Sequence, residues 1–290
     1  QYKVKKNRKR HMQSMKAVKF LGKGHSEVIE VPKPRTESGQ VLVKVMVSAV
    51  CGSERGGYMS DEPADFIPGH EFCGEIVESS NAKMLKNGDR VTINVLTGCG
   101  ECMFCHIDLP QFCKSIGIVR GGHAEYAVVP EENCMKLADD VPYDIGVLIG
   151  GDTLGVANRV VAKLPNDFGN IVYVSGSGPI GLGVIRLLKY HGYFVVASDF
   201  NQYRVGLAKD VAGADVSINL GNQDIHEILQ DLSGGYGPDI VVECSGNPAA
   251  QKTALEEVRC QGTVVFAGEN PIGLEIVPSV DIIHKEITLT

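Results

Sequence analysis

The sequence has no apolar run of the about 18 residues that a membrane-spanning helix needs. It also lacks the short apolar core of a secretory signal peptide, so we expect no membrane partner. The chain has fewer positive than negative side chains: 28 lysine and arginine residues against 35 aspartate and glutamate residues, which gives a net charge of −7. Nucleic acids and anionic surfaces attract basic proteins, so we expect neither as a main partner of this acidic chain.

One basic run departs from the acidic average. Residues 3–11 read KVKKNRKRH and precede a methionine at position 15. We interpret residues 1–14 as a leader or an expression remnant, with a nucleic-acid-binding arm as the alternative. The nine cysteines are odd in number and four of them cluster. This usage favours a reducing compartment and predicts a cytoplasmic protein.

The clustered cysteines occupy residues 98–113, GCGECMFCHIDLPQFC, with the spacing C-x2-C-x2-C-x7-C. Four thiolates this close together can close a tetrahedral shell around one structural zinc. Disulfides would need an oxidising compartment, and a redox C-x2-C motif would need a thioredoxin-like setting. An iron–sulfur cluster is a further alternative. The spacing predicts a structural zinc held by Cys99, Cys102, Cys105 and Cys113.

Hydrophobic patterning changes near residue 155 and divides the chain into two halves. Residues 16–150 contain short strands separated by turns with glycine and proline, which predicts a compact antiparallel, barrel-like unit. Beyond residue 155 strands alternate with helices, which predicts a parallel sheet with helices on both faces. Because 290 residues suffice for two cores, we expect one domain over residues 15–155 and another over residues 156–290.

A glycine-rich motif, G-x-G-x-x-G, follows the first strand of the second half. Gly176 permits a tight turn, Gly178 lets the backbone approach a pyrophosphate, and Gly181 allows close packing of helix against strand. Pro179 suits the first turn of a helix, where its missing N–H costs nothing. The free N–H groups at this helix start, including that of Ile180, are expected to hold the phosphates of a dinucleotide.

A carboxylate ends the next predicted strand. Asp199 lies 18 residues after Gly181, where it can accept hydrogen bonds from both ribose hydroxyls and repel a 2′-phosphate. This predicts NAD in preference to NADP, although Asp199 could instead cap the following helix. Arg204 is expected to reach the ribose or the adenine edge. Ser245 follows the fourth strand of this half, at the sheet edge where cofactors bind, and is a further candidate.

Three short segments outside the cysteine cluster each carry one metal-ligating residue. Cys51 lies in CGS, His70 in GHE and Asp152 in GDT. One cysteine, one histidine and one carboxylate form a three-ligand zinc site with an open fourth position, which is the catalytic type. Taken singly each is a weak signal, because a lone histidine or cysteine is more often a core residue.

The order of these motifs resembles that of the zinc-dependent alcohol dehydrogenases of the medium-chain dehydrogenase/reductase family. The resemblance spans Met15 to Thr290 and rests on residues 50–53 (VCGS), 68–74 (PGHEFCG) and 88–91 (GDRV), with the cysteine cluster and the glycine motif. It implies an α/β protein with a GroES-like β-rich catalytic domain and a Rossmann cofactor domain. It also implies a homodimer or homotetramer.

The same resemblance assigns roles to individual residues. It makes Cys51 and His70 ligands of a catalytic zinc, with Asp152 as the third ligand. Glu71 becomes an alternative ligand or an inner-sphere partner, and Ser53 the hydroxyl that passes the proton of the substrate. With the structural site, this implies two zinc ions per chain, NAD as cofactor, and hydride transfer to and from an alcohol or polyol. Candidate pocket residues for a hydrophilic substrate are Glu54, Arg55 and Tyr58.

Two departures from the family pattern are the reason to keep an alternative to an active dehydrogenase. Gly56 stands where many relatives place a histidine of the proton relay, and the chain stops at Thr290 where family members continue into the catalytic domain. We therefore keep a catalytically impaired scaffold that still binds nucleotide and zinc as an alternative. A zinc-free reductase of the same fold is disfavoured, because such relatives lack the Cys51/His70 pair. The remaining histidines after Met15 are interpreted as structural: His25, His106, His123, His191, His226 and His284.

Overall fold

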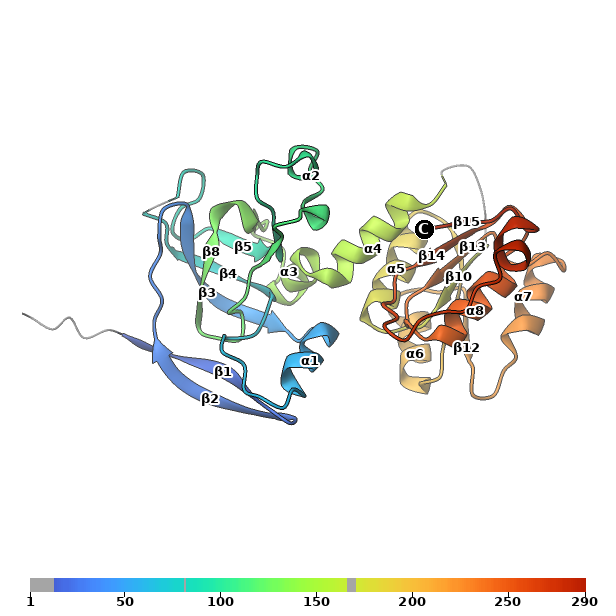
Figure 1. The fold of residues 1–290 in the computed structure, drawn as a ribbon, viewed down its shortest axis with the longest axis horizontal. Coiled ribbons are helices and arrows are strands. Elements are labelled where there is room, and N and C mark those ends of the chain that lie inside the picture. Colours follow the sequence, from blue (N-terminus) through green and yellow to red (C-terminus); the bar gives the residue numbers. More distant parts are fainter. Residues whose placement is uncertain (1–12, 81, 166–170) are drawn as a thin grey trace, which may run out of the picture. The chain divides into compact units, whose positions relative to one another are not determined.

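The structure is a computed structural model that describes residues 13–80, 82–165 and 171–290 (Figure 1). The basic run lies outside the described residues, but strand β1 (Ser14–Gly22) begins one residue before the expected domain start at Met15. The described chain up to Gly151 forms one compact unit, and Asp152–Thr290 forms a second. The division falls four residues before the expected boundary at residue 155, because helix α4 (Asp152–Lys163) already belongs to the second unit.

The first unit is built on an antiparallel five-stranded sheet in the order β8-β3-β4-β5-β9 (Figure 1). Its strands are β3 (Gln40–Ala49), β4 (Glu71–Glu78), β5 (Arg90–Ile93), β8 (Tyr126–Pro130) and β9 (Cys134–Lys136). Buried side chains such as Val43, Phe72, Ile76 and Val91 form its core. β1 pairs with β2 (His25–Pro32) as a separate hairpin. The antiparallel, barrel-like unit that the sequence predicts is confirmed as a curled antiparallel half-barrel.

Short elements in the first unit lie near several candidate metal ligands in the chain, and one of them, α2, contains Cys105. They connect strands of the sheet and include few residues each, so their positions depend on the strands that they join. They are η1 (Gly52–Glu54), α1 (Arg55–Tyr58), β6 (Leu96–Thr97), α2 (Met103–His106), η2 (Pro110–Phe112), β7 (Gly117–Ile118), η3 (Glu131–Asn133) and α3 (Tyr143–Gly150).

The second unit is a parallel six-stranded sheet in the order β12-β11-β10-β13-β14-β15 (Figure 1). Its strands are β10 (Ile171–Ser175), β11 (Phe194–Asp199), β12 (Val216–Asn219), β13 (Ile240–Glu243), β14 (Thr263–Phe266) and β15 (Thr288–Leu289). The chain order reverses between β10 and β13. Ligands of such sheets bind outside the carboxyl ends of the strands at this point.

Helices cover both faces of the parallel sheet, as the sequence predicts. One face packs against α4, α5 (Pro179–Tyr190) and α6 (Gln202–Asp210) through Val174 and Val195. The other face packs against α7 (Ile225–Ser233) and α8 (Pro248–Glu257) through Tyr173 and Val196. Successive strand residues therefore enter different cores, which explains the continuous apolar runs of these strands. A short π-helical turn, η4 (Ser279–Ile283), precedes β15.

Among the described residues, no single helix is long and apolar enough to cross a membrane, and only the bent pair α3 and α4 passes a test of length and composition together.

Candidate metal centres and dinucleotide site

The four clustered cysteines converge on one point. Their sulfur atoms all lie within 4.8 Å of one another, with 3.5 Å between Cys102 and Cys105 and 3.9 Å between Cys99 and Cys105. A tetrahedral zinc with Zn–S bonds of about 2.3 Å places its sulfurs about 3.8 Å apart. The geometry fits one metal ion that Cys99, Cys102, Cys105 and Cys113 would hold.

The same distances argue against the alternatives for this cluster. A disulfide requires a sulfur–sulfur distance of about 2.05 Å, and all nine cysteines are free thiols. An iron–sulfur cluster with several irons would spread its cysteine sulfurs more widely. Hydrogen bonds from the backbone N–H groups of Glu101 and Cys102 lower the pKa of Cys99 to about 7, whereas burial raises the pKa of Cys105 to about 11, so the thiolate is favoured at Cys99 and disfavoured at Cys105. A Cβ at Gly98 would lie 2.5 Å from the Cys105 sulfur, so glycine is required for this approach.

A second group of donor atoms comes from three separate segments. The ligand atoms of Cys51, His70, Glu71 and Asp152 also lie within 4.8 Å of one another. Strand register brings the first three together, because Ala49 at the end of β3 pairs with Glu71 at the start of β4. Cys51 and His70 therefore lie just beyond two neighbouring strand ends.

The fourth member of this group, Asp152, is positioned by the connection between α3 and α4. Asp152 is the first residue of α4 and directly follows Gly151, whose N–H donates to the Val147 carbonyl of α3 (3.1 Å). A Cβ at Gly151 would lie 3.1 Å from side-chain carbons of Glu71, so a larger residue would disturb this approach. Sulfur, imidazole and carboxylate are donors that zinc accepts together. The donor set fits a metal held by Cys51, His70 and Asp152, with Glu71 beside them.

Glu54 is the organising carboxylate around this group, with a side chain only 8% exposed. Its Oε1 accepts a hydrogen bond from the Gly69 N–H (2.7 Å) and lies 3.6 Å from Nδ1 of His70. Its Oε2 accepts from the Cys51 N–H (3.3 Å) and from Nε2 of His123 (3.1 Å). Because Nδ1 of His70 faces this carboxylate, Nε2 is the nitrogen left for a metal, an arrangement that orients metal-binding histidines.

Electrostatics keep Glu54 ionised. Burial alone would raise its pKa, but the contacts from His123, His70 and the Gly69 N–H outweigh burial and hold the pKa well below its usual range. The carboxylate therefore stays negative next to the donor group.

His123, which was interpreted as structural from the sequence, belongs to this network. Nε2 donates to Glu54, so in the neutral ring Nδ1 accepts from the Ser48 hydroxyl (2.7 Å). Gly69 makes the approach feasible, because it has a φ of +93° and a Cβ there would lie 2.3 Å from the backbone nitrogen of His123. Glu54 and His123 are 69 residues apart, and only the glycines on either side hinted at this close contact.

Ser53 and the candidate pocket residues lie on the same loop. The Ser53 hydroxyl, which is exposed, donates to the Cys51 sulfur (3.3 Å). Cys51 also forms part of the wall of a cavity of about 610 Å³ in the first unit. Glu54, Arg55 and Tyr58, the three candidates from the sequence, all line this cavity, together with apolar side chains of β1 and β3.

The dinucleotide motif occupies the turn between β10 and α5. Gly176 has a φ of +91°, and a Cβ there would lie 3.0 Å from the Ser245 Cβ. A Cβ at Gly181 would lie 1.9 Å from the Gly176 carbonyl oxygen, so Gly181 is needed for close packing. Pro179 and Ile180 form the first turn of α5.

Gly178 behaves differently from its neighbours in the motif. Its φ of −71° is open to any residue, and a Cβ there would meet no atom within 4 Å. Neither conformation nor protein packing explains a glycine at this position. Open space at the N-terminus of α5, where N–H groups are unpaired, fits a pyrophosphate that approaches the backbone.

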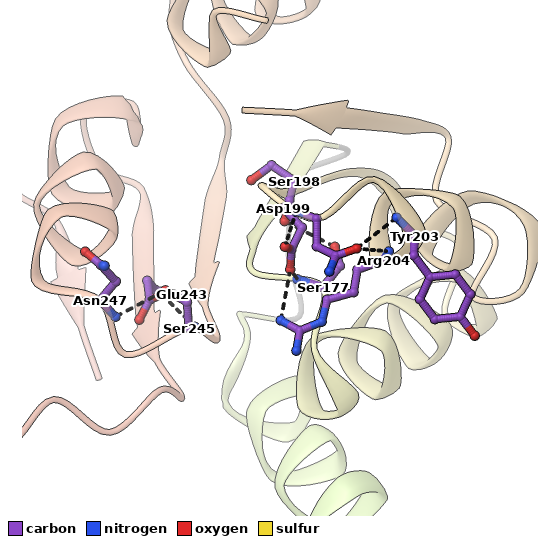
Figure 2. A network of polar contacts seen from close by, with 9 residues as sticks. Ser177, Ser198, Asp199, Tyr203, Arg204, Glu243, Ser245 and Asn247 are labelled. Atoms are coloured by element: carbon purple, nitrogen blue, oxygen red, sulfur yellow. Dashed lines mark hydrogen bonds and ion pairs between the residues drawn. The ribbon is translucent and has the colours of Figure 1, made fainter. Parts of the chain in front are cut away.

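Asp199 ends β11 and lines a cavity of about 680 Å³ with Gly176, Arg204 and Ser245. Its carboxylate accepts from the N–H groups of Ser177 (3.0 Å) and Asn201 (2.8 Å), and Arg204 lies 3.7 Å away (Figure 2). The helix-cap alternative for Asp199 is wrong, because the side chain of Asn201 caps α6. Asp199 therefore lines a cavity and does not cap the helix.

Ser245 lies across this cavity, after β13. Its N–H donates to Oε1 of Glu243 (2.7 Å), and its hydroxyl also donates to this carboxylate and accepts from the Asn247 N–H (3.2 Å; Figure 2). Glu243 is fully buried and fixes the turn in which Ser245 lies. Glu243 and Asn247 were not predicted as site residues, although Glu243 ends β13 and Asn247 lies two residues after Ser245.

Two family descriptions match the chain. "Alcohol dehydrogenase GroES-like domain" matches residues 37–139, and "Zinc-binding dehydrogenase" matches residues 179–290. The first match includes seven of the eight expected metal ligands, and the second includes Gly181 of the glycine motif. Asp152 and the start of the glycine motif lie between the two matched ranges.

Individual proteins of known name resemble the chain over most of its length. A sorbitol dehydrogenase of Halalkalibacterium halodurans is 34% identical over 283 residues, which cover 92% of this chain and 80% of the relative. An L-threonine 3-dehydrogenase of Shewanella loihica is 32% identical over 254 residues, 83% of this chain and 73% of the relative. An alcohol dehydrogenase of Escherichia coli CFT073, solved with the cofactor NADH, is 28% identical with a TM-score of 0.85 and covers 95% of this chain and 82% of its own.

Proposed function

Because this chain belongs to the zinc-binding alcohol and polyol dehydrogenases of the medium-chain dehydrogenase/reductase family, we propose that it transfers a hydride between an alcohol or polyol and NAD. The reverse direction reduces the corresponding ketone or aldehyde. One observation carries this proposal: the ligand atoms of Cys51, His70, Glu71 and Asp152 lie within 4.8 Å of one another. The family relatives favour an active enzyme over an impaired scaffold, because both curated relatives are named as dehydrogenases.

The two metal centres have different roles in this proposal. Cys51, His70 and Asp152 hold the catalytic ion, with Glu71 as an alternative ligand or an inner-sphere partner. The four clustered cysteines hold a structural ion, which gives two zinc ions per chain. A closed all-cysteine shell leaves no position for substrate, whereas the mixed set can.

The residues of the chain handle the proton and position the reactants. A zinc ion held here would supply a Lewis acid that makes the hydroxyl of the alcohol more acidic, and bound NAD would supply the acceptor for the hydride from its carbon. Ser53 lies beside Cys51 and is exposed, so its hydroxyl can take the proton of the alcohol and pass it to solvent. Glu54 holds His70 in its orientation, and Gly56 leaves open space where relatives place a histidine. The substrate occupies the cavity whose wall includes Cys51.

We assign NAD, and not NADP, as the cofactor. Asp199 and Arg204 line the cavity beside the glycine motif, and the Asp199 carboxylate would accept hydrogen bonds from ribose hydroxyls. A 2′-phosphate at this point would meet a negative charge. Gly176, Gly178, Pro179, Ile180 and Gly181 hold the pyrophosphate, and Ser245 contributes to the opposite wall.

The proposal also includes a cellular location and an oligomeric state. Nine free thiols support a reducing, cytoplasmic location. A homodimer or homotetramer follows from the family assignment.

Metal analysis combined with a substrate screen tests this function. We expect two zinc ions per chain and NAD reduction with at least one alcohol or sugar alcohol. Cys51→Ser should leave one zinc and abolish turnover, while Cys134→Ser, at a cysteine outside both groups, should retain two. Two zinc ions and NAD binding without turnover of any alcohol would instead support the scaffold, and a lower KM for NADP than for NAD would overturn the cofactor assignment.

A further inference from the structure

The cavity beside Cys51 contains one arginine. Arg55 begins helix α1 and forms part of the cavity wall, together with Glu54, His123, and hydroxyl groups from Ser26, Ser48 and Tyr58. The rest of the wall is largely apolar and includes Phe20 and Val50. Arg55 is an exposed residue, so its guanidinium is accessible to a ligand that enters this cavity.

Glu54, the neighbouring carboxylate, does not neutralise Arg55. Its two oxygens are committed to the N–H groups of Cys51 and Gly69 and to the rings of His70 and His123. The negative charge of Glu54 therefore serves the candidate metal site, while the positive charge of Arg55 belongs to the cavity.

No other carboxylate of the described chain compensates Arg55 either. Within residues 13–80, 82–165 and 171–290, its guanidinium forms no ion pair and no hydrogen bond. Arg35, Arg159 and Arg186 have no partner among the described residues either, but Arg55 is the unpaired arginine that lines the cavity beside Cys51. An arginine left with all its donors in a concave wall is suited to an external anion.

The local backbone places this cation near the candidate metal ligands. The Glu54 N–H donates to the Cys51 carbonyl (3.1 Å), and the Met59 N–H donates to the Arg55 carbonyl (2.9 Å). These two hydrogen-bonded turns define the backbone path from Cys51 to Met59, which includes Arg55. Tyr58 follows on the same helix, and its ring packs edge-on against Phe20 at 5.4 Å, so its position in the wall is fixed as well.

Building on the proposed dehydrogenase function, we propose that the alcohol substrate carries an anionic group, a carboxylate or a phosphate, that Arg55 binds. The reacting hydroxyl lies at Cys51 and His70, and the anion lies a few bonds away at the guanidinium. Arg55 is then a specificity-determining residue, because a planar guanidinium binds two oxygens of either anion at once. A neutral alcohol of equal size would leave this cation without a partner.

Matched pairs of compounds test the charge of the substrate. The first pair is 3-hydroxybutyrate and its methyl ester, and the second is glycerol 1-phosphate and glycerol. The zinc-loaded protein with NAD is assayed for kcat/KM, and binding of each compound is measured by calorimetry. We expect the anion to exceed its neutral partner about 10- to 100-fold in one pair, and that pair identifies carboxylate or phosphate.

Substitutions assign the preference to Arg55. Arg55→Gln should reduce the anion-to-neutral ratio at least tenfold, and Arg55→Lys should restore it in part, because lysine keeps the charge without the two-pronged geometry. Arg35→Gln, at an exposed arginine outside the cavity, changes the net charge equally and should leave the ratio unchanged.

Two results would overturn the assignment: neutral compounds preferred in both pairs, or an anion preference that survives Arg55→Gln. If no compound is turned over, the dehydrogenase proposal fails, and the calorimetric ratios still decide whether Arg55 selects anions.

Discussion

Replacing Glu54 by glutamine tests whether this carboxylate supports the catalytic metal. The substitution keeps the size of the side chain but turns one oxygen into an NH₂ group. Whichever oxygen the NH₂ group replaces, it would face an N–H donor. Gly69 donates to Oε1, and both Cys51 and His123 donate to Oε2. At least one charge-assisted hydrogen bond is lost, which should lower the free energy of unfolding by about 1.5–3 kcal/mol.

The same substitution should weaken metal binding at one centre only. Loss of the carboxylate that orients a metal-binding histidine typically costs 10- to 100-fold in metal affinity, or about 1.4–2.7 kcal/mol. The cysteine cluster has no contact with Glu54 among the described residues and should keep its ion. We therefore expect Glu54→Gln to lose one of two zinc ions to a chelator, and the other to remain.

Timed chelation of purified protein measures this difference. Zinc released to a chromogenic chelator is followed for the wild type, Glu54→Gln and Glu27→Gln, the last at an exposed glutamate on β2. One equivalent should be released at least tenfold faster from Glu54→Gln, and Glu27→Gln should match the wild type. Equal release from all three proteins, with Glu54→Gln folded by circular dichroism, would show that Glu54 does not support the metal site.

Three further predictions concern the second unit. Gly181→Ala should lower the Tm, because its Cβ would lie 1.9 Å from a carbonyl oxygen. Gly178→Ala should keep the Tm but lower the affinity for NADH at least tenfold, as measured by fluorescence titration. Equal losses of Tm in the two variants would refute this distinction. Asp199→Ala should raise the KM for NAD about 10- to 100-fold and reduce the preference over NADP, and an unchanged ratio would contradict the ribose contact. A hydrogen bond with Glu257 (3.0 Å) raises the pKa of His226, so the stabilisation by this pair is full below the unfolded pKa and disappears as pH rises through the folded one. The difference in urea unfolding between wild type and His226→Gln should therefore shrink from pH 5.5 to pH 8.5, and a constant difference would disprove the linkage.

The sequence predicted local sites more completely than long-range contacts. All four members of the cysteine cluster fall within 15 residues, so chain connectivity alone limits how they can meet, and their spacing sufficed to identify them. The glycine motif is equally local, and its position after β10 was predicted. The alternation of strands and helices also predicted the parallel sheet, because each strand is apolar on both faces.

Contacts between distant segments were predicted only in part. Cys51, His70 and Asp152 were named from the order of motifs, but the pairing of β3 with β4 is what brings the first two together. His123 was interpreted as a structural residue, and its link to Glu54 depends on the left-handed Gly69 and on two backbone hydrogen bonds between residues 68–69 and 122–123. No pattern in the flanking sequence specifies such a register.

The sequence by itself therefore determined the types of chemistry available: a thiolate cluster, a mixed-ligand metal set and a phosphate-binding turn. Only the tertiary structure decided which charges are already paired. Glu54 and Arg55 are adjacent in the chain, yet folding surrounds the carboxylate with four partners and leaves the guanidinium in a cavity wall. The physical reason is that a charge is compensated by whatever lies within a few ångströms, and strand register, not sequence proximity, sets those neighbours.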